Sequence, residues 1–468
     1  MAENTTNPRS LAAVILAAGK GKRVRSSTPK VLLPVVGRPL LWHVLQTLRV
    51  AKPSKIVIVV GHGADEVREA VRSWGIKPTP VFVEQAEQLG TGHAVLEAER
   101  AVGRVSEVLV ANGDFDPVRP GDVRALLRTH RRTNSAASLI TAEMDPAGYG
   151  RVIREGSRLT AIREVADATL AERGISEGAT NWAVFRRADL YRALPLLDRD
   201  NRQGEYFLNR VYPILLDKGE RVSAVPADTG RLIGANSREE LSALERLLRG
   251  RINDDLLASG VTLVDPDTTY VDAGVRVGTD TVLHPLTFLA GETVVGRRCR
   301  IGPSTRLVDS RVADDASVTF AVAEGARIGR GSDVGPFARL RPGTRLAAGV
   351  HVGSYVEIKA STIGEGTKVP HLSYVGDATV GRRANVGAAT VTVNYDGYDK
   401  HRTRIGDDAR IGSDTMLVAP VHVGKGAVTG AGSVITKDVP AGSLAVERSE
   451  QRTVKGYRKR KDREHGAS

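Results

Sequence analysis

The sequence predicts an α/β domain with a mostly parallel, Rossmann-like sheet, followed by a linking helix and a parallel β-helix. A change in hydrophobic period along the chain predicts this division. Up to about residue 235, apolar runs alternate with stretches of helical spacing, whereas beyond about residue 260 single apolar residues recur every six positions. A chain of 468 residues is also too long for one ordinary hydrophobic core, so we expect two or three domains.

The first half opens with an apolar run over 11–18, which leads into a glycine-rich loop. A helical pattern follows over 41–48, then a second strand-like run over 56–60 and a second helical pattern over 64–74. Alternating strands and helices are typical of a parallel sheet with helices on both faces. Ligands bind such sheets at the carboxyl ends of the strands, so we expect a site in the loops that follow them.

A capping box at 237–240 (SREE) predicts the start of a helix between the two halves. Leucine and isoleucine then recur at helical spacing as far as Leu256. We therefore divide the chain into a first domain over 1–236, a linker helix over 237–260, a β-helix over 261–448 and a basic tail over 449–468.

The six-residue period is the strongest architectural signal in the sequence. Apolar residues stand six apart in three runs, over 277–307, 322–358 and 405–423. One apolar residue in every six fits a triangular parallel β-helix, in which each inward side chain stacks on its counterpart one turn along. The polar segment 394–404 (NYDGYDKHRTR) interrupts this period, so it should protrude as a loop, and such loops often carry binding residues.

Charge and composition exclude several classes of protein. The net charge of +13 is spread along the chain except for a cluster at 455–463 (KGYRKRKDR), which we interpret as a solvated tail. No nucleic-acid-binding motif accompanies the charge, so small polyanionic ligands are the expected partners. The early apolar run is too short to span a bilayer and lacks a cleavage site, so we expect no membrane insertion. The single cysteine, Cys299, fits a cytoplasmic location.

The segment 16–23 (LAAGKGKR), followed by Pro29-Lys30, predicts a phosphate-binding loop. Glycines at a strand end let backbone N–H groups face a phosphate, and the cations Arg23 and Lys30 stand nearby. The alternative is a tight turn with surface cations, which the Pro-Lys at this spacing disfavours. The loop resembles the signature of sugar-nucleotide pyrophosphorylases.

Two further segments, 85–94 (QAEQLGTGHA) and 148–151 (GYGR), resemble the uracil- and sugar-binding segments of one family. This is the family of bifunctional N-acetylglucosamine-1-phosphate uridyltransferases and glucosamine-1-phosphate N-acetyltransferases, and the resemblance runs from about residue 11 to residue 456. It implies that the β-helix is left-handed, that Mg²⁺ is a cofactor, and that acetyl-CoA and UTP are substrates. The chain would acetylate glucosamine 1-phosphate and then uridylylate the product to UDP-N-acetylglucosamine, a cell-wall precursor.

The resemblance also assigns residues in the first half. UTP and the UDP-sugar would contact Leu16, Gly19, Arg23, Lys30, Gln85, Gly90, Thr91, Gly150, Glu164, Asn181 and Asn236. Mg²⁺ would be held by Asn236 and by Asp114, which stands in the segment 111–118 (ANGDFDPV). The sugar phosphate would attack the α-phosphorus of UTP and displace pyrophosphate. This chemistry needs positioning, cations and a metal, but no protein nucleophile.

The first half departs from the family pattern at Lys22, Asp116, Trp182, Ala183, Asn209 and Arg210. Asp116 stands beyond the Gly-Asp pair, and it either supplements Asp114 or is a solvated turn residue; we favour the second interpretation. The other departures concentrate where the sugar should bind. A second hypothesis therefore keeps the acetyltransferase and treats the first half as weakened or as acting on another sugar phosphate.

In the second half, His371 stands within the segment 370–377 (PHLSYVGD). A neutral imidazole can accept a proton from an ammonium group that must become a nucleophilic amine, and Glu357 could orient that imidazole. The resemblance implies that His371 is the general base and that Asn394 and Ser413 lie near the thioester, where hydrogen-bond donors stabilise the oxyanion.

The resemblance implies two binding sets for this reaction. Glucosamine phosphate would contact Arg341, Lys359, Tyr374, Asn385, Tyr395 and Lys400. Acetyl-CoA would contact Ala388, Ser413, Ala431 and Arg448. The site in such β-helix acetyltransferases forms between neighbouring subunits, so a homotrimer is implied, and flat triangular faces can pack around a three-fold axis. A third hypothesis, a non-catalytic trimeric nucleotide-binding scaffold, is disfavoured because His371, Glu357, Asp114 and Asn236 occur together.

Overall fold

The computed structural model describes residues 10–115, 117–143, 150–156, 158–163, 167–201, 203–227 and 234–466. The chain divides into two compact units, Met1–Leu248 and Arg249–Ser468, and we describe each by itself. Two expected positions, Asp116 and Glu164, lie outside the described residues, as do the side chains of Lys22 and Asn181.

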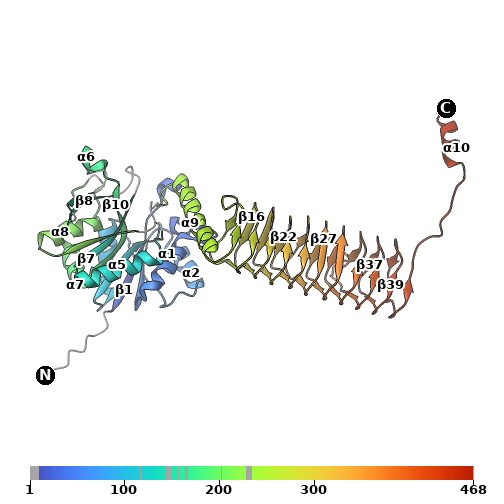
Figure 1. The fold of residues 1–468 in the computed structure, drawn as a ribbon. Coiled ribbons are helices and arrows are strands. Elements are labelled where there is room, and N and C mark those ends of the chain that lie inside the picture. The colour runs from blue at the N-terminus through green and yellow to red at the C-terminus, as the bar shows by residue number, and fades with distance from the viewer. Residues whose placement is uncertain are drawn as a thin grey trace, which may run out of the picture. The chain divides into compact units, whose positions relative to one another are not determined.

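A sheet forms the centre of the first unit (Figure 1). It has nine strands, with the main order β11-β7-β10-β6-β1-β4-β5. Along this order, every neighbouring pair is parallel except the two that involve β10. The mostly parallel sheet is therefore confirmed. The strands of the main order are β1 (Leu11–Ala17), β4 (Lys55–Val60), β5 (Val81–Glu84), β6 (Glu107–Asn112), β7 (Ala137–Glu143), β10 (Glu177–Arg186) and β11 (Val222–Pro226), and the hairpin of β8 (Arg151–Glu155) and β9 (Arg158–Arg163) pairs beside β10.

Helices cover both faces of this sheet, because its central strands are apolar on both sides. In β1, Ala13 and Ile15 belong to one buried cluster, whereas Ala12 and Val14 belong to another. The helices are α1 (Leu40–Leu48), α2 (Ala64–Ser73), α3 (Thr91–Glu97), α4 (Glu99–Val102), α5 (Pro120–Thr133), α6 (Leu170–Arg173), α7 (Arg187–Ala193) and α8 (Val211–Asp217). Short 3₁₀ turns join them, among them η2 (Lys30–Leu32) and η5 (Leu208–Arg210).

The helix α9 (Arg238–Ala258) begins after Ser237, whose Oγ accepts a hydrogen bond from the Glu240 N–H at 3.2 Å. The boundary between the two units falls within this helix. No helix in the described part of the chain is long and apolar enough to cross a membrane.

The second unit is a three-sided parallel β-helix, as the six-residue period predicts (Figure 1). As far as β40, each sheet collects every third strand in chain order, since the chain visits the three sheets in turn, and β41 then follows β39 in the first sheet. Inward residues such as Ile301, Val318 and Val334 are fully buried and stand opposite one another on successive strands. The first sheet runs from β12 (Thr262–Leu263) to β41 (Leu444–Ala445), the second from β13 (Tyr270–Val271) to β40 (Val434–Ile435), and the third from β14 (Arg276–Val277) to β38 (Val421–Val423).

One inward position differs from the sequence-based expectation. Val322 was expected to point inward, but it is 37% exposed, and Ala323 is fully buried in its place. The register of the second sheet explains this, because Leu307 stands opposite Ala323 and Ala323 opposite Leu340.

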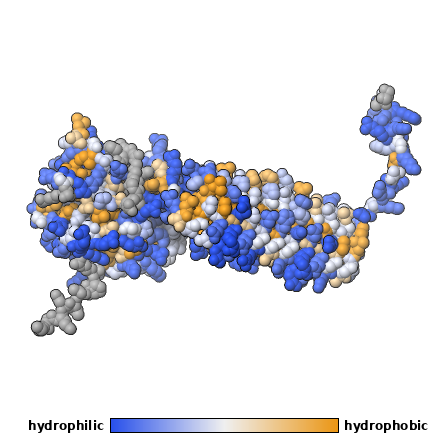
Figure 2. Space-filling model, in the orientation of Figure 1, coloured by the Kyte–Doolittle hydropathy of each residue, from blue (hydrophilic) through white to orange (hydrophobic). Residues whose placement is uncertain are grey.

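Three corners join the sheets. Corner 1 connects the first sheet to the second, as at 371–373; corner 2 connects the second to the third, as at 359–361; and corner 3 connects the third to the first, as at 406–409. The insertion at 394–402 leaves corner 2 before β35 (Thr403–Ile405). The chain ends in the exposed, hydrophilic helix α10 (Tyr457–Glu464), which is coloured mostly blue in Figure 2.

Candidate active sites

The first site lies at the carboxyl ends of the neighbouring strands β1 and β6. Leu16 stands opposite Asn112, and the Gly113 N–H donates to the Leu16 carbonyl at 2.8 Å. A Cβ at position 113 would lie 3.2 Å from both that carbonyl oxygen and Leu41 Cδ1. Glycine therefore lets the chain turn tightly here, and Asp114 follows directly at the sheet edge.

Lys30 connects the two expected metal ligands. Its Nζ lies 2.8 Å from Asp114 Oδ2 and donates to Asn236 Oδ1 at 2.7 Å. The Lys30 side chain is only 7% exposed, so the ammonium is held between these two oxygens. The backbone fixes the ligands as well, since the Ala235 N–H donates to the Asp114 carbonyl and the Asn236 N–H to Glu240 Oε2.

The donor set around this ammonium suits a hard divalent cation. A carboxylate oxygen and an amide oxygen are ligands that Mg²⁺ accepts, and Mg²⁺ usually completes its shell with water and substrate phosphates. Within the described ranges, no group of three or more His, Cys, Asp or Glu residues could hold a metal alone. Asp114 and Asn236 therefore fit a magnesium site that depends on further ligands.

A cavity of about 290 Å³ opens beside this cluster. Its walls include five of the expected residues, which are Arg23, Thr91, Asp114, Gly150 and Asn236. Gln85 and Gly90 lie next to Thr91, and Gln85 Nε2 donates to the Gly90 carbonyl at 3.1 Å. Gly90 has φ +111°, and a Cβ there would lie 2.6 Å from the Tyr206 carbonyl oxygen, so only glycine fits.

Among the departures from the family pattern whose side chains the structure describes, two line this cavity and two do not. Trp182 is fully buried in the hydrophobic cluster on the opposite face of the sheet from Ala183. Ala183 and Asn209 do line the cavity. The bulkiest departure therefore does not fill the space where the sugar is expected.

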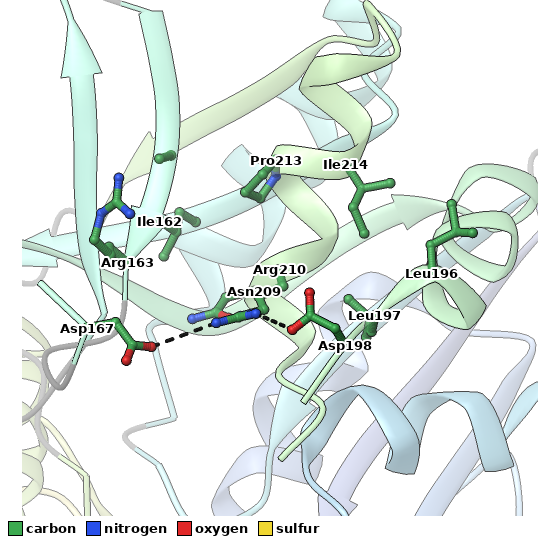
Figure 3. A pocket seen from close by; sticks show the side chains of 11 residues that line it. Ile162, Arg163, Asp167, Leu196, Leu197, Asp198, Asn209, Arg210, Pro213 and Ile214 are labelled. Carbon is green, nitrogen blue, oxygen red and sulfur yellow. Dashed lines mark hydrogen bonds and ion pairs between the residues drawn. The ribbon is translucent and has the colours of Figure 1, made fainter. Parts of the chain in front are cut away.

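Arg210 points into a second cavity, of about 380 Å³ (Figure 3). Figure 3 shows its guanidinium between Asp167 and Asp198, with ion pairs to both, the first at 3.9 Å. It also donates to the Asp200 carbonyl at 2.6 Å. Asn209 lines both cavities, so Arg210 stands behind the wall of the first one.

The second site follows corner 1 of the β-helix. His371 ends β30 (Lys368–His371), and the expected acetyl-CoA residues Ala388, Ser413 and Ala431 occupy the corresponding place on the next turns. Backbone hydrogen bonds connect these turns: Ala389 N–H donates to His371 O, Asp414 N–H to Ala388 O, and Gly432 N–H to Ser413 O. A guanidinium N–H of Arg448 donates to the Ala431 carbonyl at 3.1 Å. The structure thus places Ala388, Ser413 and Ala431 on successive turns after His371, with Arg448 beside Ala431.

The expected phosphate-binding cations gather on the second sheet and at corner 2. Arg341 donates to Glu357 Oε1 at 3.0 Å, and Lys359 Nζ lies 3.3 Å from Asp377 Oδ2. The side chains of Lys359 and Lys400 lie close together, and their interaction raises the pKa of Lys359 and lowers that of Lys400. Two neighbouring ammonium groups repel each other, so this cluster favours an anion such as a phosphate.

Glu357 contacts Arg341 rather than the expected histidine. In the part of this single chain that the structure describes, no hydrogen bond to the His371 ring is present, so its orientation by Glu357 stays a prediction. Tyr374 stands opposite Glu357 on β31 (Tyr374–Gly376), whereas Asn385 lies exposed on the first sheet. One chain therefore brings Arg341, Lys359, Tyr374 and Lys400 together, but not Asn385.

The insertion after Asn394 forms a closed loop. Tyr395 pairs with Lys400 in an isolated bridge, and the His401 N–H donates to the Asn394 carbonyl at 2.8 Å. His401 Nε2 lies 2.7 Å from Asp396 Oδ2 and holds the pKa of that carboxyl well below its usual range. Asn394, at the base of the loop, is only 7% exposed.

Sequence reasoning missed Asp377. Its Oδ2 accepts hydrogen bonds from Lys359 Nζ at 3.3 Å and from Asn394 Nδ2 at 2.5 Å. Asp377 stands 18 residues after Lys359, about one turn of the β-helix, and this spacing could have predicted that the two side chains lie side by side. Aspartate is common at left-handed turns for structural reasons, so the sequence alone did not distinguish it.

Comparisons with known proteins agree with both units. Residues 13–211 match the family model described as a MobA-like NTP transferase domain, and residues 402–437 match the bacterial transferase hexapeptide (six repeats). The chain is 47% identical over 459 residues to the "Bifunctional protein GlmU" of Streptomyces avermitilis, covering 97% of this chain and 95% of that one. It is 44% identical over 447 residues to the protein of the same name from Carboxydothermus hydrogenoformans, covering 95% and 99%. The chain, with its nucleotidyltransferase-like first unit and its left-handed hexapeptide β-helix, therefore belongs to the GlmU family of bifunctional transferases.

Proposed function

We propose that this chain makes UDP-N-acetylglucosamine in two steps, acetyl transfer to glucosamine 1-phosphate and then uridylyl transfer to the product. The observation that supports the proposal is that each unit has its own cluster of expected site residues: Lys30, Asp114 and Asn236 gather in the first unit, and Lys359 and Lys400 gather in the second, which also contains His371. A cluster of one cation with two oxygen ligands, and a cluster of cations in the unit that contains the histidine, match two different reactions. We place both reactions in the cytoplasm.

In the first site, UTP would bind against the glycine loop and the segment 85–91. Asp114 and Asn236 would hold Mg²⁺, which would offset negative charge on the phosphates. Arg23 and Lys30 supply positive charge where phosphates approach. A phosphate oxygen of N-acetylglucosamine 1-phosphate attacks the α-phosphorus, the bond to the β-phosphate oxygen breaks, and pyrophosphate leaves.

In the second site, His371 accepts a proton from the glucosamine ammonium group. The amine then attacks the thioester carbonyl carbon of acetyl-CoA, with Asn394 and Ser413 near the developing oxyanion. The carbon–sulfur bond breaks and the attacking nitrogen gives up a second proton. Coenzyme A leaves as the thiol after taking up one of the two protons, and the other is released to solvent. Arg341, Lys359 and Lys400 would bind the sugar phosphate, and Ala388, Ala431 and Arg448 would contact acetyl-CoA.

We also propose a homotrimer, in which a neighbouring subunit completes the acetyltransferase site. An exposed column of large apolar side chains follows corner 1, formed by Phe320, Phe337, Tyr355 and Leu372, which are 39–61% exposed. All four adopt positive φ, an unusual conformation for bulky residues. The ring centroids of Phe320 and Phe337 lie 5.6 Å apart, and those of Phe337 and Tyr355 lie 5.3 Å apart. Such a patch is typical of a protein interface. Because Leu372 follows His371, a partner on this column would lie beside the base.

The alternative of a weakened uridyltransferase has less support. Trp182 and Arg210 are not among the residues that line the first cavity. We therefore expect these departures to leave substrate access open.

Two assays on the purified protein test the proposal. With Mg²⁺, UTP and N-acetylglucosamine 1-phosphate, we expect release of pyrophosphate. With acetyl-CoA and glucosamine 1-phosphate, we expect release of coenzyme A. Coenzyme A release without pyrophosphate release would favour the alternative, and loss of both would refute the proposed function.

A further inference from the structure

Asp377 occupies a rigid position at corner 2. It follows β31, its φ is +50°, and its backbone N–H donates to the Lys359 carbonyl at 3.0 Å. Its side chain is 17% exposed. The carboxylate is therefore fixed by the corner on which it stands, one turn along from Lys359.

One oxygen of this carboxylate contacts members of both predicted substrate sites. Oδ2 accepts hydrogen bonds from Lys359 Nζ, one of the cations expected to bind the sugar phosphate, and from Asn394 Nδ2, near the expected position of the thioester. A carboxylate can only accept hydrogen bonds, so the amide group of Asn394 must turn its NH₂ toward Asp377. That NH₂ has two hydrogens, and fixing one of them sets the direction of the other. Because Asn394 is almost fully buried, it has little freedom to turn otherwise.

The surrounding charges give Asp377 a second effect. Three cations gather here, since Lys359 and Arg341 both lie near Lys400. Glu357 holds Arg341, and Asp377 holds Lys359. Asp377 thus holds the Lys359 ammonium group in place although Lys400 repels it. The cluster keeps a net positive charge, which favours an anionic ligand.

We propose that Asp377 is a positioning residue that couples the two substrates of acetyl transfer. By fixing Lys359 and Asn394 through one oxygen, it sets the distance between the bound sugar phosphate and the hydrogen-bond donor at the thioester. This inference rests on the proposed acetyl transfer. Asp377 itself need not touch either substrate.

The test begins with Asp377→Asn, which keeps the side-chain size but removes the charge and one acceptor oxygen. We expect kcat for coenzyme A release to fall about 10- to 100-fold, because a misplaced donor costs transition-state stabilisation. KM for acetyl-CoA should stay within about twofold, since the residues expected to contact it along corner 1 are unchanged. Uridylyl transfer and the thermal midpoint report on folding and should also stay unchanged.

A matched control is Asp408→Asn. Asp408 is also a corner aspartate with positive φ (+60°), and it holds Arg383 by two hydrogen bonds at 2.8 and 3.0 Å, but at corner 3. Its variant should keep full acetyl transfer. An equal loss in both variants would mean that corner aspartates matter only for the fold and would overturn the inference.

Double variants test whether Asp377 acts through its partners. With Asn394→Ala already present, Asp377→Asn should lower kcat by no more than about threefold, because the residue through which it acts is gone. Asp377→Asn alone should raise KM for glucosamine 1-phosphate, because Lys359 loses its partner, and with Lys359→Met present it should no longer do so. If the fall in kcat of the double variant equals the product of the falls in the two single variants, the proposed coupling is wrong.

The failure of this inference can be distinguished from failure of the proposed function. If the wild-type protein releases no coenzyme A, the acetyl transfer itself is wrong and the inference falls with it. If the wild type is active and Asp377→Asn behaves like it, only the inference is wrong. Should Asp377→Asn fail to fold, Asn394→Asp replaces it: two facing carboxylates repel, and we expect the same fall in kcat, whereas unchanged kcat overturns the inference.

Discussion

Replacing Lys30 with methionine should expose a competition between this side chain and the metal. The Lys30 ammonium contacts Asp114 Oδ2 and Asn236 Oδ1, which are the two oxygens proposed to hold Mg²⁺. Without nucleotide, a divalent cation must displace the ammonium before it can bind both oxygens. Methionine has a similar length but no charge, so Lys30→Met leaves both oxygens available to the metal.

The size of the effect follows from the two contacts that the metal must replace. A hydrogen bond between charged groups contributes about 1.5–3 kcal/mol, and each 1.4 kcal/mol changes an equilibrium tenfold. We therefore expect Lys30→Met to bind Mn²⁺, a spectroscopic substitute for Mg²⁺, about 10- to 100-fold more tightly in the absence of UTP. Electron paramagnetic resonance of free Mn²⁺ measures this affinity directly. Uridylyl transfer should nevertheless fall, because a cation near the phosphates is lost.

Lys20→Met is the matched control, because Lys20 stands exposed in the same glycine loop. It should leave the Mn²⁺ affinity unchanged. An unchanged or weaker affinity in Lys30→Met would refute the competition and would mean that the metal binds elsewhere or beside the ammonium.

Three further predictions concern the other parts of the molecule. His371→Ala should lower acetyl transfer at least about 100-fold, as expected for loss of a general base, while uridylyl transfer continues; equal loss of both activities would contradict two separate sites. Tyr355→Glu should convert the proposed trimer to smaller species in light scattering and reduce acetyl transfer, because a charge enters the apolar column at corner 1; a stable, active trimer would place the interface elsewhere. Burial lowers the pKa of His43 from its ordinary value of 6.5, so the unfolded chain binds the proton more readily and stability is lost as the pH falls from 6.5 toward the folded-state pKa. His43→Gln should therefore show a smaller drop in thermal midpoint on acidification than the wild type, and an equal drop would assign that dependence to other groups.

The sequence predicted the β-helix well, because its core repeats with a fixed period that can be counted. The prediction was wrong at Val322, because the smaller residue Ala323 points inward there and the count of large apolar residues did not include it. The antiparallel direction of β10 could not be predicted either, because both faces of a central strand are apolar whichever way it runs.

The resemblance predicts which residues form the sites, but it could not predict the contacts between them. Lys30 and Asn236 are 206 residues apart, and only the fold brings the ammonium to the amide oxygen. Similarly, Glu357 was expected to contact His371, whereas it contacts Arg341 in this chain. Long polar side chains have several partners within reach, so their choice depends on the three-dimensional arrangement of charges rather than on sequence spacing.

The two sites use the same three residue types in opposite arrangements, and this difference determines how each responds to its ligand. In the first site a lysine lies between an aspartate and an asparagine, so the central group is a cation, which a divalent cation must displace to bind both oxygens. In the second site an aspartate lies between a lysine and an asparagine, so the central group is a carboxylate fixed at a rigid corner. An anionic ligand there would bind to the outer cation without displacing the centre. Removing Lys30 should consequently strengthen metal binding, whereas removing the Asp377 charge should disorder both of its neighbours, and the opposite signs of these two effects test the comparison.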